Sequence, residues 1–171
     1  IQEGVVPSHS QLAIIDEYIL ALKHYLGEIP ILENESEQKK LIYLLRIMVY
    51  LRVLRSDLEA VESVQALREE PSLYQLGLDF IHILGNHVQQ SEDLLSANKI
   101  FDLNFDLLNL KQWSDQHRKD IRDHIVRYAH DHHLNAAKSL ELFAAQRWAD
   151  RLIEHSQRLA NVLSEKYELK S

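Results

Sequence analysis

The sequence predicts an all-α protein, an antiparallel bundle of about five helices. Apolar residues recur at intervals of three and four along most of the chain, and no stretch shows the strict alternation of a half-buried strand. Only four glycines and three prolines occur in 171 residues, so there are few places for turns. With 46% hydrophobic residues, a chain of this length can bury one core, and we expect a single domain over residues 1–171.

The first two expected helices begin at serine and asparagine caps. The first starts after Ser8 or Ser10 and is defined by the spacing of Leu12, Ile15, Ile19, Leu22 and Leu26. The second starts at Asn34, with Glu37 three residues later as in a capping box, and is predicted to run without a break to about residue 68.

Three more helices are expected in the second half. Pro71 suits a first helical position, and the third helix should continue toward Leu95. Residues 96–104 are interpreted as a polar connection, followed by helices over 110–128 and 134–167. The two long helices, the second and the fifth, should pack through a common set of apolar residues: Leu44, Leu51, Leu54 and Leu58 with Trp148, Leu152 and Leu159.

Composition excludes several classes of function. The 26 acidic and 19 basic residues give a net charge of −7, which argues against nucleic acid as the main partner. The absence of cysteine excludes disulfides, thiol catalysis and cysteine-ligated zinc. The most apolar run, residues 41–54, is interrupted by Arg46 and Arg52 and is too short to span a bilayer. We expect a soluble segment that does not insert into a membrane, and its start at Ile1 suggests a piece excised from a longer chain.

Three of the ten histidines cluster around Asp131: His130, His132 and His133. The cluster lies where the fourth helix gives way to the fifth, and nothing nearby supplies the remaining ligands of a zinc site. We expect a solvated connection with exposed histidines. The alternative is a metal-dependent phosphohydrolase of the HD type, in which His82 or His87, the pair His130–Asp131 and Asp150 would bind metal.

Two stretches on the long helices resemble each other. These are LRSDLEAVESVQAL (54–67) and AQRWADRLIEHSQRLA (145–160), which align with Glu59 opposite Asp150. Both are similar to the signature of PhoU-type proteins, in which an acidic residue, three others and an aspartate follow one another. The stretch 14–29 also resembles the preceding helix of that family. The resemblance covers roughly residues 11–167.

The resemblance implies a PhoU-like fold, one helix short of two three-helix repeats. Residues 1–10 would be a flexible leader, 11–69 a first partial repeat and 72–168 a second repeat. Such a shortened module is most similar to the cytoplasmic C-terminal region of bacterial Na+/phosphate cotransporters. It implies a non-catalytic regulatory or interaction module at the cytoplasmic face of the membrane, with a free-standing PhoU-like regulator of phosphate signalling as an alternative. The implied partner is the transporter membrane domain in the same polypeptide or a phosphate transporter complex, together with a homodimer.

The resemblance also implies where metal would bind. PhoU relatives carry iron or zinc at paired acidic residues. The second stretch keeps both acids as Asp150 and Glu154, whereas the first keeps Glu59 but has Ser63 at the second position. No cofactor is required, and any iron or zinc should be weakly bound.

The helical positions of these acids favour salt bridges over metal binding. Asp150 and Glu154 lie on the side of their helix opposite Leu152, so both should face solvent. Glu154 can pair with Arg158 one turn later.

Overall fold

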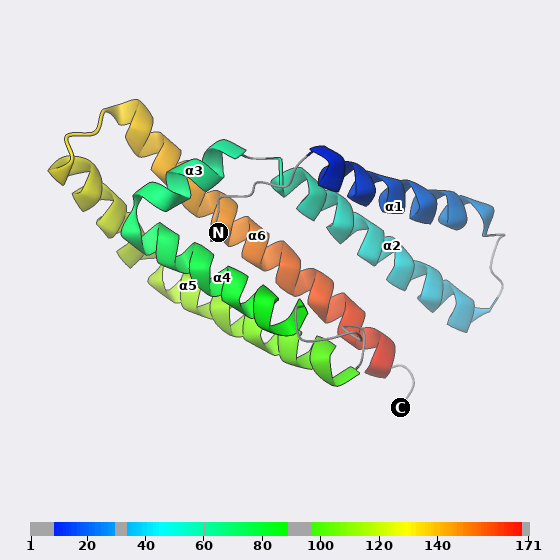
Figure 1. Ribbon diagram of the computed structural model, residues 1–171. Coiled ribbons are helices and arrows are strands. Elements are labelled where there is room, and N and C mark those ends of the chain that lie inside the picture. The colour runs from blue at the N-terminus through cyan, green and yellow to red at the C-terminus, as the bar shows by residue number, and fades with distance from the viewer. Residues whose placement is uncertain (1–8, 30–33, 60, 89–96, 169–171) are drawn as a thin grey trace.

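The structure, a computed structural model, describes residues 9–29, 34–59, 61–88 and 97–168. All regular structure in these ranges is helical, which confirms the all-α prediction, but there are six helices rather than about five (Figure 1). In chain order they are α1 (His9–Glu28), α2 (Glu35–Asp57), α3 (Val61–Glu69), α4 (Pro71–Val88), α5 (Ala97–Asp131) and α6 (Ala136–Glu168).

The prediction of one uninterrupted helix to residue 68 is wrong, because α2 ends at Asp57 and α3 begins at Val61. No glycine or proline marks the break. In a continuous helix the carbonyl of Asp57 would accept the N–H of Val61. That carbonyl instead accepts the indole N–H of Trp148, at 2.7 Å, from the other end of the sequence. A tertiary hydrogen bond therefore uses the carbonyl at the end of α2, and the residues around Asp57 give no sign of it.

Residues 97–104 are also corrected, from a polar connection to the first turns of α5. Ile100, Leu103 and Leu107 are buried at helical spacing. The polar residues among them, Lys99 and Asp102, lie on other sides of the helix. The apolar residues of this stretch do recur at helical spacing, but the many polar residues between them obscured that pattern in the sequence. The expected end of the third helix near Leu95 and the cap at Ser8 lie outside the described residues.

Side-chain caps fix the starts of α2, α4 and α6. The Asn34 side chain accepts the N–H of Ser36 at 2.9 Å, as predicted for the start of α2. Pro71 is the first residue of α4, also as predicted, and the buried carboxylate of Glu70 accepts the N–H of Leu73 at 2.8 Å. Asn135 accepts the N–H of Lys138 at 2.9 Å and starts α6.

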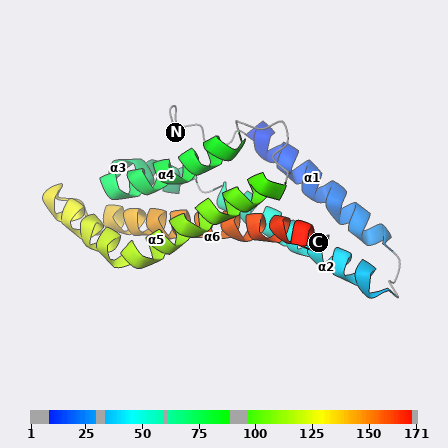
Figure 2. The ribbon, with the colours of Figure 1, turned by 90° about the horizontal axis from the view of Figure 1, so that it is seen from below.

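The central element is α6. Among the described helices it contacts α2, α3, α4 and α5, whereas α1 contacts α2 alone. Helices α4, α5 and α6 form an antiparallel three-helix unit, with α3 at one end. The α1–α2 hairpin attaches to this unit through α2, and α1 diverges from the rest (Figure 2). None of the described helices is both long and apolar enough to span a membrane.

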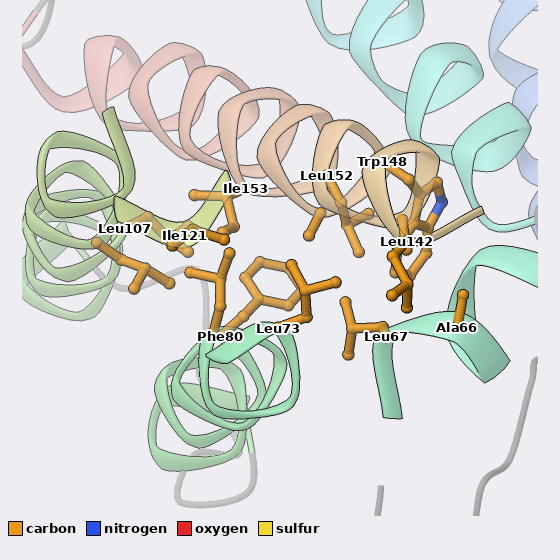
Figure 3. Close-up of a cluster of buried hydrophobic side chains, with 14 of the residues drawn as sticks. Ala66, Leu67, Leu73, Phe80, Leu107, Ile121, Leu142, Trp148, Leu152 and Ile153 are labelled. Carbon is orange, nitrogen blue, oxygen red and sulfur yellow. The ribbon is translucent and has the colours of Figure 1, made fainter. Parts of the chain in front are cut away.

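The core lies where α6 meets α3, α4 and α5. Its buried side chains from these four helices point toward one another (Figure 3). Of the predicted common interior, Trp148 and Leu152 belong to this cluster, and Leu54 and Leu58 pack against it. The other three predicted members are only half-buried and lie outside it: Leu44, Leu51 and Leu159. The buried side of α6 is wider than predicted because the helix has neighbours on several sides.

Two leucines near the start of α6 test this assignment. Leu142 is fully buried and Leu140 is 64% exposed. We expect Leu142→Ala to lower the free energy of unfolding by about 2–5 kcal/mol, through lost burial and the cavity left behind. The matched variant Leu140→Ala should change it by no more than about 0.5 kcal/mol. Urea denaturation measures both, and equal effects would contradict the assigned face.

Candidate functional site

Asp57 carries a buried carboxylate whose part in the fold sequence reasoning missed. It is the last residue of α2, and its side chain is 10% exposed. The ring N–H of His155 donates to one carboxylate oxygen at 2.7 Å, and Arg151 approaches the other at 3.5 Å. With the indole bond of Trp148 to its carbonyl, Asp57 receives three side chains from α6. This Asp57 junction fastens α2 to the centre of the molecule.

Asp150 faces α5 rather than solvent, so the prediction of a wet position is wrong. The Ser114 hydroxyl donates to it at 2.6 Å, and Arg118 donates at 3.3 Å. Ser114 is buried, and the buried Gln146 donates to the carbonyl of Arg118. Asp150 therefore belongs to a polar seam within the α5–α6 interface, where its oxygens already have protein donors.

The other two predicted metal-binding carboxylates are also paired. Glu154 accepts from Arg158 at 2.5 Å, as predicted. A hydrogen bond to Tyr50 and the nearby charge of Glu154 raise the pKa of Arg158. Glu59 pairs with Arg55 at 2.7 Å, far along the chain from either acid of α6.

Arg55 joins α1 to the end of α2. It donates to both carboxylate oxygens of Asp16, at 3.0 and 2.8 Å, as well as to Glu59. Hydrogen bonds to Asp16 and then to Glu59 raise the pKa of Arg55. Glu59 thus contributes to the α1–α2 hairpin through Arg55, whereas Asp150 accepts hydrogen bonds within the α5–α6 interface. Within the described part of the chain, no three histidine or acidic side chains gather in a group that could hold a metal ion.

The histidine cluster forms the C-terminal cap of α5. His133 has a φ of 52°, and its N–H donates to the carbonyl of His130 while the N–H of Leu134 donates to that of Ala129. This pair of bonds is the Schellman motif, which usually has glycine at the position of His133. His132 stacks on Tyr128 with ring centroids 4.0 Å apart. All three histidines are exposed, as predicted.

The residues nominated for an HD-type hydrolase are not brought together. His87 bonds Asp106 at 2.8 Å, near the start of α5, whereas His130 ends that helix. Residues 106 and 130 lie roughly 36 Å apart along the axis at the usual helical rise. Asp150 bonds Ser114, which is roughly 24 Å from His130 by the same measure.

The exposed surface of α2 offers a different kind of site. Ile42, Leu45 and Val49 are 56%, 39% and 52% exposed at a spacing of three and four. With Arg46 and Tyr50 they line a hollow of about 210 Å³. At Val49 it meets a second hollow of about 400 Å³ that reaches Asp57. We call this continuous depression the α2 groove.

No family model, curated protein or solved structure matches this chain. The resemblance of residues 54–67 and 145–160 to PhoU-type proteins therefore stands on those residues alone. The structure places the second stretch wholly within α6, but the first extends across the break between α2 and α3.

The Asp57 junction can be tested by removing only the charge. Asp57→Asn keeps the backbone carbonyl that Trp148 uses, and we expect it to cost about 1–3 kcal/mol because a buried charged hydrogen bond is lost. Glu59→Gln, two residues on but with a 59% exposed side chain, should leave the unfolding midpoint nearly unchanged. His155→Gln should add little once Asp57 is replaced. Fully additive effects of the two substitutions would show that the pair does not interact.

A substitution at His133, in the cap of α5, should raise the free energy of unfolding rather than lower it. His133→Gly should raise the free energy of unfolding by about 0.5–1 kcal/mol, because glycine adopts positive φ without a Cβ clash. His130→Gly, within α5, should lower it by up to about 1 kcal/mol. Thermal unfolding at matched pH measures both variants. Destabilisation by His133→Gly would mean that this imidazole has a role beyond the cap.

Proposed function

We propose that this chain is a non-catalytic interaction module of phosphate transport, and that it binds its partner through the α2 groove. The observation that carries the proposal is the exposure of Ile42, Leu45 and Val49 on a helix that is otherwise built into the fold. Contiguous exposed apolar surface of this kind marks interaction sites. Arg46 is already paired with Glu165, but Arg52 also borders the groove, which favours a partner helix with apolar residues at helical spacing and an acidic residue at its edge.

The arrangement of helices supports the same proposal. A two-helix hairpin, α1–α2, precedes a three-helix unit, α4–α6. The resemblance to PhoU-type proteins implies such an order, a first repeat lacking one helix and then a complete repeat, although α3 is additional. The proposed context is the cytoplasmic PhoU-like region of a Na+/phosphate cotransporter, whose membrane domain, or a phosphate transporter complex, would supply the partner. A free-standing regulator of phosphate signalling would use the same groove.

Metal has a minor part in this proposal. Asp150, Glu154 and Glu59 each already accept hydrogen bonds from a neighbouring arginine, and Asp150 also from Ser114. An iron or zinc ion would have to displace these donors and find a further ligand, so its binding should be weak and dispensable.

The test is phosphate uptake in cells that express the full-length protein. Replacing Ile42, Leu45 and Val49 together with serine should change uptake, or its response to external phosphate, by about fivefold or more if a buried apolar contact is lost. The matched control replaces Val126 and Leu140, exposed on α5 and α6, with serine and should have no effect. Unchanged uptake in the groove variant, at equal protein level, would refute the proposal.

The purified protein should also leave phosphate esters intact. Turnover of a phosphate monoester that Asp131→Ala abolishes would replace the interaction module with a hydrolase.

A further inference from the structure

A second apolar stripe lies on α1, on a side that no other described element covers. Ile14, Tyr18 and Tyr25 are 52%, 71% and 57% exposed. With the exposed Ala21 they are spaced by four, three and four residues, the repeat of a helix that packs against another helix. We call these four residues the α1 stripe.

The α1 stripe is distinct from the side of α1 that holds the hairpin together. The residues turned toward α2 are buried or half-buried: Leu12, and the residues one position after each stripe residue, Ile15, Ile19, Leu22 and Leu26. One residue corresponds to a rotation of about 100° around the helix. A further helix can therefore lie on the α1 stripe without displacing α2, and the open position of α1 in Figure 2 leaves room for it.

We propose that the α1 stripe pairs with the same stripe of a second copy of this chain, antiparallel and about a twofold axis. This surface is separate from the α2 groove and does not depend on the proposed function. A twofold axis between residues 19 and 20 sets Ile14 against the partner's Tyr25, and Tyr18 against the partner's Ala21. Each large side chain then meets a smaller one, which is the size complementarity that close helix packing requires.

The polar residues beside the stripe are complementary in the same register. Glu17 is exposed and precedes Tyr18, and His24 is exposed and precedes Tyr25. Antiparallel pairing brings Glu17 near the partner's His24, and the symmetry repeats this contact. His24 uses Nδ1 toward Glu28, at 3.3 Å. Its Nε2 lies on the far side of the ring, and because both ring nitrogens donate in the imidazolium form, that form can bond Glu28 and the partner's carboxylate together. In a parallel pair about a twofold axis, Glu17 and the partner's His24 would lie on opposite sides of the interface, so this contact could not form.

The expected dimer is weak. Aromatic side chains bury about 150–250 Å² each when fully covered, and the two tyrosines of each copy are 71% and 57% exposed. With Ile14 and Ala21, the two copies together would bury on the order of 800 Å², at the low end for association in solution. We therefore expect a dissociation constant on the order of 10–100 µM.

Sedimentation equilibrium of the full chain tests the pairing, at loadings from roughly 10 µM to 1 mM that bracket this affinity. The wild type should follow a monomer–dimer equilibrium. Replacing Tyr18 and Tyr25 with serine should weaken it about tenfold or more. Leu20→Ser is the matched control, because Leu20 is 65% exposed on the same helix but off the stripe, and it should dimerise like the wild type. A monomeric wild type at every loading, or dimerisation that survives the tyrosine replacements, would overturn the proposal.

A charge exchange tests orientation. Glu17→Lys and His24→Glu should each weaken the dimer, and the double variant, which restores an opposite pair across the axis, should recover it. Recovery fails if the helices are parallel or if the occupant is another protein. Circular dichroism of each variant should match that of the wild type, which separates loss of the interface from loss of α1.

Discussion

The position of the α1–α2 hairpin on the rest of the bundle depends on one contact, between the indole of Trp148 and the end of α2. Trp148 donates to the carbonyl of Asp57, and His155 and Arg151 hold the carboxylate of the same residue. The carbonyl that would have continued α2 is thus directed to α6. The chain can then turn, form α3 at the end of the bundle and enter α4. A single residue closes one helix and joins it to the central one.

Other polar contacts between helices also involve α6. Asp150 and Gln146 bind α5 through Ser114 and Arg118, and further along Glu165 receives both terminal nitrogens of Arg46, at 2.5 and 2.9 Å. Because α6 has neighbours on several sides, polar residues along it lie in interfaces and must find partners there. In the described residues no buried polar side-chain atom lacks a hydrogen bond. The acidic residues of α6 therefore have structural roles, which explains why an acidic pattern there need not signal a metal site.

The hairpin is built differently. Among the described helices α1 contacts α2 alone, with Leu12 as its buried apolar residue and a bidentate contact between Asp16 and Arg55 near the end of α2. Both helices leave apolar residues in solvent at helical spacing, on the α1 stripe and in the α2 groove. The core is buried among α3, α4, α5 and α6, whereas the hairpin still exposes apolar residues, so further contacts would bury the most apolar surface on the hairpin.

The sequence by itself determined the helical class, the starts of α2 and α4 and the exposure of the histidine cluster, because these follow from local spacing and capping. Asn34, Pro71 and the period of Leu12 to Leu26 act within one or two turns, and their effect can be read without a neighbour. Tertiary structure alone decided the break after Asp57, the partial burial of Asp150 and the pairing of Arg55 with Asp16 on α1. Each depends on a side chain far away in sequence: Trp148, Ser114 and Asp16. A helical wheel gives the angle of a residue around its own helix axis but not which angles have a neighbour. Because α6 is covered on several sides, the carboxylate of Asp150, which was expected to face solvent, is instead partly buried against α5.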